Sequence, residues 1–269
     1  MSYIKALSLA PDVNDWLTKS QHPRILHVFD PACNLINERG DVLSIVTQQI
    51  GNGPFNLVIE DDIFFSEHLH VQSSISIRGT QLQLGDLTID TADAHLWSPL
   101  PNWETLHAQR DDILTRLRSF PIPDFQFPNS LPSSLSSADL ASSIAAARQL
   151  AGLGIGLTPA GDDFILGAIL ATWIVHPFDV AKVFAEEIAN TAAPLTTSLS
   201  AAWLKSAGKG EAGILWHEFF DALIAGDAVG IQSQIDKLLS LGETSGADAL
   251  SGFLGTFVCW GEMSGFNIS

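Results

Sequence analysis

The sequence predicts an α+β protein, with an antiparallel β-rich domain first and a mainly helical domain second. Between Arg24 and about Trp97, apolar and polar residues alternate in short runs that turn-forming sequences separate. After about Ser137 the chain has longer segments with helical spacing, and several end at a glycine, as helices commonly do. We expect a β-rich domain over 1–100, a helix and a Pro/Ser-rich linker over 101–137, and a helical domain over 138–269.

Six short segments in the first domain have the alternation of strands. Polar turns containing Gly, Pro, Asp or Asn separate them, which favours a meander or a barrel-like sheet. The segments are Arg24–Asp30, Asp41–Ile50, Phe55–Glu60, Ser74–Gly79, Thr80–Leu84 and Asp86–Asp90.

Helical spacing begins after Pro99, in Glu104–Phe120, and the stretch 119–137 that follows is rich in Pro and Ser. Beyond it almost every segment has the pattern of a helix. The segments are Ala138–Gly154, Asp162–Val175, Asp179–Asn190, Ser198–Gly210, Gly213–Gly226, Ala228–Gly242 and Ala247–Trp260.

The charge of the chain excludes some kinds of partner. There are 30 acidic and 13 basic residues, a formal net charge of −17, which would repel nucleic acid and anionic membranes. The start lacks the basic and apolar regions of a signal peptide, and the longest apolar run, Phe164–Val175, is shorter than the roughly 20 residues of a membrane span. Only two cysteines are present. We expect a reduced, cytoplasmic protein that binds neither nucleic acid nor membrane.

The most unusual segment is GLGIGLTPAGDD, residues 152–163. Its glycines let a loop backbone present several N–H groups to one small anion. Thr158 followed by Pro159 predicts a helix start, with Thr158 as the N-cap. Asp162 and Asp163 then fall in the first turn of an apolar helix, where two buried carboxylates are costly unless paired, protonated or bound to a metal. Capping explains one of them more easily than both.

A second segment, SGADALSG at 245–252, repeats the pattern of AGDDFILG at 160–167. In both, a glycine, an aspartate and a further glycine occur at the same spacing, and an apolar helix follows. A glycine one turn after each aspartate allows another helix to approach closely. We therefore expect two buried helices that meet near their N-termini and direct Asp163 and Asp248 toward one site. A chance likeness between small-residue helix starts is the alternative.

These two segments, together with FDPACNLINERGDVLSIVTQQIGNGPFNLVI at 29–59, resemble a bacterial family long catalogued as a domain of unknown function. One member is a subunit of oxamate carbamoyltransferase, an enzyme of anaerobic allantoin and purine breakdown. The resemblance covers nearly the whole chain. It implies carbamoyl transfer between oxalurate and phosphate, carried out with companion subunits. The family usually has Ser where this chain has Ala160, so that hydroxyl is absent here.

The sequence thus indicates one candidate site, which can be interpreted in several ways. The substrates implied by the resemblance are anions, which suit a glycine loop at a helix start but not the aspartates. A bound Mg²⁺ would remove this conflict, and so would an aspartate that is protonated or acts as a base on a carbamoyl nitrogen. The candidates are Asp162, Asp163 and Asp248 for catalysis, Asp162 and Asp163 for the metal, and Gly154, Gly156, Thr158, Gly161, Ser245 and Gly246 for binding a small anionic substrate.

Two further interpretations belong to other functional classes. The chain could be a non-catalytic partner that stabilises an enzyme complex, or a module that senses a small anion. The sequence leaves the oligomeric state open, and a homo-oligomer is one alternative.

Overall fold

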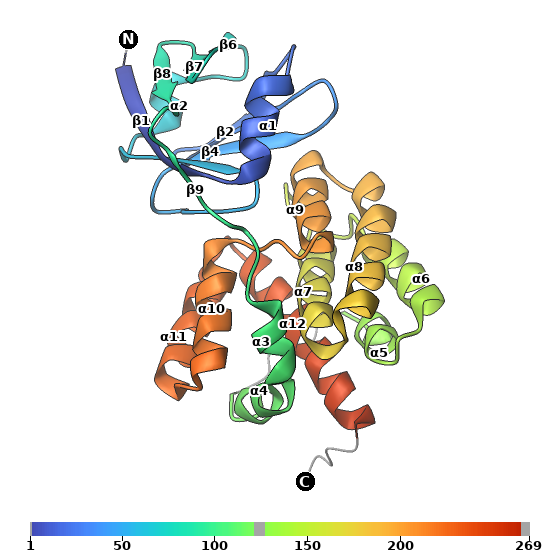
Figure 1. The fold of residues 1–269 in the computed structure, drawn as a ribbon. Helices are drawn as coiled ribbons and strands as arrows, with labels where there is room; N and C mark the ends of the chain where they lie inside the picture. Colours follow the sequence, from blue (N-terminus) through green and yellow to red (C-terminus); the bar gives the residue numbers. More distant parts are fainter. Residues whose placement is uncertain (1, 121–126, 265–269) are drawn as a thin grey trace. The chain divides into compact units, whose positions relative to one another are not determined.

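The computed structural model describes residues 2–120 and 127–264 (Figure 1). The chain divides into two compact units, Met1–Pro99 and Leu100–Ser269. The first is built mainly of strands and the second of helices, which confirms the predicted α+β class. Residues 121–126, within the Pro-rich stretch, lie outside the described part of the chain.

The first unit is a nearly closed mixed sheet with the strand order β2-β3-β4-β5-β1-β8-β7-β6, and β9 also pairs with β1. Most neighbouring strands are antiparallel, whereas β1 runs parallel to β8 and β9, and β4 parallel to β5. The strands are β1 (Ser2–Leu9), β2 (Arg24–Val28), β3 (Ala32–Ile36), β4 (Val42–Val46), β5 (Asn56–Ile59), β6 (Ile75–Arg78), β7 (Gln81–Leu84), β8 (Leu87–Asp90) and β9 (His95–Leu96).

Strand β1 lies at the centre of this sheet, between β5 and β8, although the predicted strands began only at Arg24. Two helices, α1 (Pro11–Lys19) and α2 (Phe65–His68), complete the unit. Alternate residues of the strands, such as Leu35, Ile45 and Leu57, form the core together with Trp16 of α1. The predicted alternation corresponds to one core-facing side in β7 and β8, whereas residues on both sides of β3, β4 and β5 are buried.

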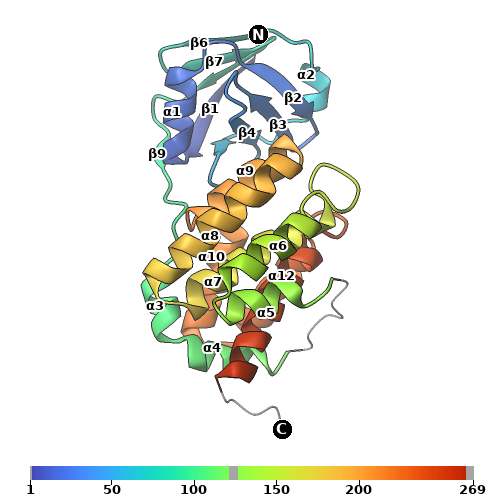
Figure 2. The same ribbon diagram turned by 90° about the vertical axis from the view of Figure 1, so that its right-hand side faces the viewer.

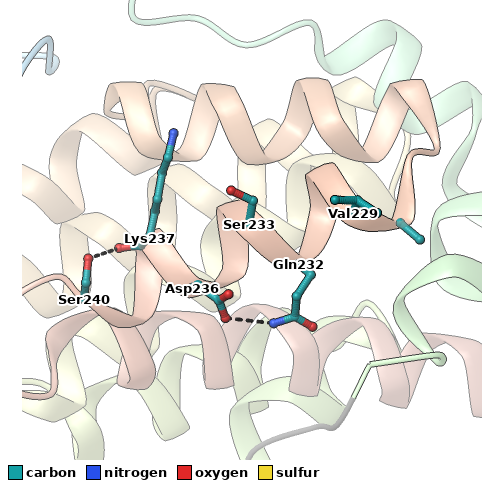
Figure 3. A pocket seen from close by; sticks show the side chains of 7 residues that line it. Val229, Gln232, Ser233, Asp236, Lys237 and Ser240 are labelled. Carbon is teal, nitrogen blue, oxygen red and sulfur yellow. Dashed lines mark hydrogen bonds between the residues drawn. The ribbon is translucent and has the colours of Figure 1, made fainter.

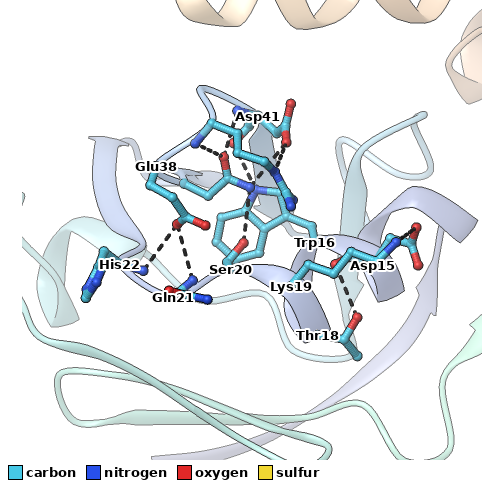
Figure 4. A network of polar contacts seen from close by, with 11 residues as sticks. Asp15, Trp16, Thr18, Lys19, Ser20, Gln21, His22, Glu38 and Asp41 are labelled. Carbon is cyan, nitrogen blue, oxygen red and sulfur yellow. Dashed lines mark hydrogen bonds and ion pairs between the residues drawn. The ribbon is translucent and has the colours of Figure 1, made fainter.

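A network of polar contacts fixes α1 to the turn between β3 and β4 (Figure 4). The indole N–H of Trp16 donates to the backbone carbonyl of Asp41 at 2.8 Å. The carboxylate of Glu38 accepts from the backbone N–H groups of Gln21 and His22. Asn37, which is buried, accepts through Oδ1 from the backbone N–H of Asp41 at 2.9 Å. Each of these hydrogen bonds provides a partner for a polar group of the loops, so the polar residues at this end of the unit have a structural role.

The second unit is an assembly of helices, and α3, α4 and α5 of the expected linker region belong to it (Figures 1 and 2). No helix in the described part of the chain is long and apolar enough to cross a membrane. The helices are α3 (Trp103–Ala108), α4 (Arg110–Leu117), α5 (Ser130–Ser136), α6 (Leu140–Leu150), α7 (Ala160–Val175), α8 (Phe178–Ala192), the 3₁₀ turn η1 (Ala193–Leu195), α9 (Ser198–Gly208), α10 (Ile214–Ala225), α11 (Ala228–Leu239) and α12 (Ser245–Met263).

Helix α7 is buried along almost its whole length, as its continuous apolar sequence predicts. It packs directly against α12 at two glycines. A Cβ added to Gly167 would lie 1.7 Å from the carbonyl oxygen of Ala249, and one added to Gly252 would lie 2.0 Å from that of Phe164. The two contacts are reciprocal, because each glycine faces the residue directly after the aspartate of the other helix. The predicted meeting of these helices is confirmed.

This packing yields a stability prediction. Replacing Gly167 by Ala should lower the free energy of unfolding by about 2 kcal/mol, because overpacking against backbone outweighs the roughly 1 kcal/mol gained in helix propensity. Denaturant unfolding measures the change. The control is Ala225→Ser, which also adds one atom to a helix but at an exposed position, and which should change stability by less than about 0.5 kcal/mol. Wild-type stability in Gly167→Ala would contradict the close approach.

Candidate functional site

The start of α7 is closed by a tight turn that leads back to α6. The backbone N–H of Gly161 donates to the carbonyl of Leu153 at 2.8 Å. A Cβ added to Gly161 would lie 2.1 Å from the carbonyl oxygen of Leu150, at the end of α6, and 3.1 Å from the Cβ of Leu153. Only glycine fits at this position without a shift of the backbone.

The start of α12 repeats this arrangement with respect to α11. The backbone N–H of Gly246 donates to the carbonyl of Leu241 at 3.1 Å. A Cβ added to Gly246 would lie 1.7 Å from the carbonyl oxygen of Leu238 and 3.1 Å from the Cβ of Leu241. The likeness seen in the two sequence segments therefore extends to the preceding helices, and α6–α7 and α11–α12 form matching helix–loop–helix units.

Asp163 lies in the first turn of α7 and is only partly exposed. Its Oδ2 atom is buried and has no hydrogen-bond partner among the described residues. The pKa of this carboxyl is raised to about 7, mainly by burial. Hydrogen bonding by the hydroxyls of Ser245 and Thr158 acts against this rise, and the charges of Asp248 and Asp162 contribute to it. At neutral pH the group is poised between its protonated and ionised forms.

Asp248 occupies the matching position in α12 and is 5% exposed. Its Oδ2 atom is also buried without a partner in the described part of the chain. Burial raises its pKa, and a hydrogen bond from the hydroxyl of Thr244 lowers it in part. Because the charge of Asp248 acts on Asp163, the two carboxyl groups form one electrostatic pair.

A hydrogen bond links the two helix starts beside this pair. The hydroxyl oxygens of Thr158 and Ser245 lie 2.9 Å apart. The expectation that Thr158 caps α7 is wrong, because Pro159 occupies the N-cap position and no side chain caps the helix. The Thr158 hydroxyl contacts Ser245 on the other helix start instead, and both hydroxyls act on Asp163.

Asp162 differs from its neighbour in that both of its carboxylate oxygens have partners. It is 2% exposed, and Oδ1 accepts from the backbone N–H of Gly152 at 2.8 Å. Oδ2 accepts from the hydroxyl of Thr196. These bonds account for its burial and tie the beginning of the glycine loop to the segment before α9. The contribution of Thr196 was not foreseen in the sequence, since a threonine 34 residues away carries no local signal.

The loop between Gly152 and Thr158 is held at both ends and exposed in the middle. At its far end the carbonyl of Leu157 accepts at 2.5 Å from the hydroxyl of Thr197, another residue that the sequence did not single out. Gly154 and Gly156 have φ values of 126° and 96°, which disfavour any other residue. Between them, the Ile155 side chain is 96% exposed. The loop thus keeps its middle accessible while its ends are fixed.

Of the residues predicted for the site, Thr158, Asp163, Ser245 and Asp248 come together at the two helix starts. Gly161 and Gly246 lie at these starts in tight backbone contacts, and Gly154 and Gly156 lie in the exposed part of the loop. No group of three or more His, Cys, Asp or Glu side chains in the described part of the chain is placed to hold a metal ion. A cation at this site would therefore need ligands from substrate or water as well.

A separate surface pocket lies along α11 (Figure 3). It is lined by Val229, Gln232, Asp236 and neighbouring residues, and the amide of Gln232 donates to Asp236 at 2.8 Å. None of the residues nominated from the sequence lines this pocket, so it adds nothing to the candidate site.

The titration of Asp163 gives a prediction for the pH dependence of stability. Its pKa in the folded protein, about 7, lies above the ordinary value of 3.8, so the folded state holds the proton more tightly and loses stability as the pH rises from about 4 to about 7. Asp163→Asn removes this loss. We expect the variant to be about 1–2 kcal/mol more stable than wild type at pH 8, with the difference vanishing near pH 4. Urea unfolding across this range measures it.

The contrasting variant is Asp162→Asn, which weakens two satisfied hydrogen bonds of a buried group. It should be less stable than wild type at pH 8 by about 1–3 kcal/mol. If Asp163→Asn instead loses stability at every pH, the carboxyl of Asp163 has a partner that the described contacts do not include.

Models of known protein families match segments of both units. The model of oxamate carbamoyltransferase subunit AllH matches residues 150–257, which include both glycine–aspartate segments. The model of the AllH family N-terminal domain matches residues 5–96, which are almost the whole of the β unit. No solved structure matches the chain. Because the two models together cover most of its length, the chain belongs to the AllH family of oxamate carbamoyltransferase subunits.

Proposed function

We propose that this chain carries a substrate site of a carbamoyl-transferring enzyme and that it acts together with companion subunits. The observation that supports the proposal is the pair of carboxyl groups, Asp163 and Asp248, whose unpartnered oxygens lie at two adjoining helix starts. Both residues fall within the segment that matches the family model. Buried polar atoms without partners are rare in folded proteins and call for a partner beyond the residues that the structure describes.

The reaction implied by the family is carbamoyl transfer from oxalurate to phosphate. A phosphate oxygen attacks the ureido carbonyl carbon, the bond from this carbon to the oxamate nitrogen breaks, and the nitrogen takes up a proton. We assign the proton to Asp163, because a group with a pKa of about 7 donates and accepts protons efficiently at neutral pH. In the opposite direction, the same carboxylate would take the proton from oxamate.

The anionic parts of such substrates need donors of their own. The glycine loop offers backbone N–H groups between Gly154 and Thr158, and the starts of α7 and α12 carry the partial positive charge of a helix N-terminus. We place the phosphate and carboxylate groups of the substrate near these donors and the nitrogen near the carboxyl pair. Thr158 and Ser245, which hydrogen-bond to each other, would fix the spacing of the two helix starts.

The Mg²⁺ expected from the sequence stays a prediction. Both oxygens of Asp162 already accept hydrogen bonds, so a cation would be held mainly by Asp163, Asp248, substrate and water. If it binds, Mg²⁺ should raise the thermal midpoint of the wild type, because binding to the folded state alone stabilises it, and Asp163→Asn should lose the response. An equal response in both proteins would remove Asp163 from the metal site.

The proposed function predicts the effect of removing one carboxylate. In the enzyme assembled with its companion subunits, Asp163→Asn should lower turnover by about 100-fold or more, the usual contribution of an acid–base group, without loss of assembly. Asp227→Asn is the matched control. Asp227 is also a helix-start aspartate, but its oxygens accept from the backbone N–H groups of Val229 and Gly230, and Asn caps a helix equally well.

The alternative is a non-catalytic partner that stabilises the complex. In that case Asp163→Asn and Asp248→Asn would both assemble and turn over at the wild-type rate. Full activity of these variants would therefore reject the proposed function in favour of the structural role.

A further inference from the structure

We infer that Asp163 and Asp248 determine the substrate specificity of the site. The pair selects compounds that carry an amide nitrogen, the nitrogen that leaves with oxamate, over compounds with a methyl or a carboxylate group in the same position. The inference rests on the proposed function, which places this nitrogen near the carboxyl pair, and it adds that the pair discriminates between an amide nitrogen and other groups. It starts from the two unpartnered oxygens.

Each carboxyl group has one buried oxygen, Oδ2, without a partner among the described residues. Asp248 gives the stronger indication of a missing partner, because the residue is only 5% exposed and water has little access to it. An ionised carboxylate oxygen can only accept hydrogen bonds, so the partner that favours the ionised form of the pair is a donor or a cation. The pair therefore requires a group that presents hydrogen-bond donors or positive charge.

A primary amide supplies two N–H donors on a single nitrogen. The two helix starts that carry these acceptors lie side by side, because the hydroxyls of Thr158 and Ser245 are 2.9 Å apart. One amide nitrogen can thus satisfy both orphan oxygens. A methyl group of similar size would leave both oxygens unpaired, and a second carboxylate would add a like charge to the pair.

The remaining oxygens do not compete for this group. Asp162 has both oxygens occupied by Gly152 and Thr196, which keeps it out of the pair. The hydroxyls of Thr158 and Ser245 lie 2.9 Å from each other, and both act on Asp163, so they are engaged within the site. The selective contact therefore belongs to Asp163 and Asp248 alone among the nominated residues.

Oxamate and pyruvate test this directly, because they carry the same carboxylate and carbonyl and differ only in an NH₂ or a CH₃ group. Isothermal titration of the full chain at pH 7 in the presence of EDTA should show oxamate binding about tenfold to a hundredfold more tightly than pyruvate, and oxalate more weakly than oxamate. Asp163→Asn and Asp248→Asn should each bring the oxamate-to-pyruvate ratio close to one. Asp227→Asn should leave it unchanged.

The outcomes separate this inference from the proposed function. Equal binding of oxamate and pyruvate by the wild type, or oxamate binding that requires Mg²⁺, would overturn the inference and leave the substrate site in place. No binding of any of the three compounds, either by the folded chain alone or by the chain assembled with its companion subunits, would overturn both. The comparison of ligands on the wild type decides the question even if a variant fails to fold.

Discussion

The direct contact between α7 and α12 is the constraint on which the candidate site depends. Two glycines, Gly167 and Gly252, let the backbone of each helix reach the other one turn after its aspartate. At such short range no side chain separates the helices, so their first turns must also lie near each other. The aspartates precede these glycines by four residues, which places both on the side where the helices meet.

The three aspartates at these helix starts show how burial alone does not fix the role of a carboxyl group. Asp162 is almost fully buried, and each of its oxygens accepts a hydrogen bond, so it secures the loop. Asp163 and Asp248 are also removed from water, but each retains one oxygen without a partner among the described residues. Burial is the main cause of their raised pKa values, and the charge of Asp248 adds to the effect at Asp163. The three residues are of the same type, so their roles differ because of the hydrogen-bond donors that lie within reach of each carboxylate.

Much of the fold and the centre of the site could be predicted from the sequence, because both depend on local patterns. Strand alternation indicated the sheet, and the spacing of Gly and Asp in two segments indicated the paired helices. The central strand β1 was missed, although its buried residues Ile4 and Ala6 alternate with exposed ones. Its position follows from pairing with β5 and β8, which lie far along the chain, and single-sequence patterns carry no such information.

The tertiary contacts that complete the site could not be predicted from the sequence for the same reason. Thr158 has the local signal of a helix cap, yet tertiary packing places Ser245 beside it, and its hydroxyl contacts that residue instead. Thr196 and Thr197 hold the glycine loop from a segment about 40 residues away, where their sequence suggests only a helix start. Local chemistry thus nominated the residue types, and the three-dimensional arrangement decided which of them act together.

The central claim is that Asp163 and Asp248 form one interacting pair at the junction of two helices. A double-mutant cycle on the free energy of unfolding at pH 8 measures this interaction directly, with wild type, Asp163→Asn, Asp248→Asn and the double variant. We predict that the two single effects fail to add by about 1 kcal/mol or more, because either substitution relieves the same repulsion, and that the coupling shrinks at pH 5 as the pair takes up protons. Effects that add to within about 0.5 kcal/mol at pH 8 would show two independent groups and contradict the account.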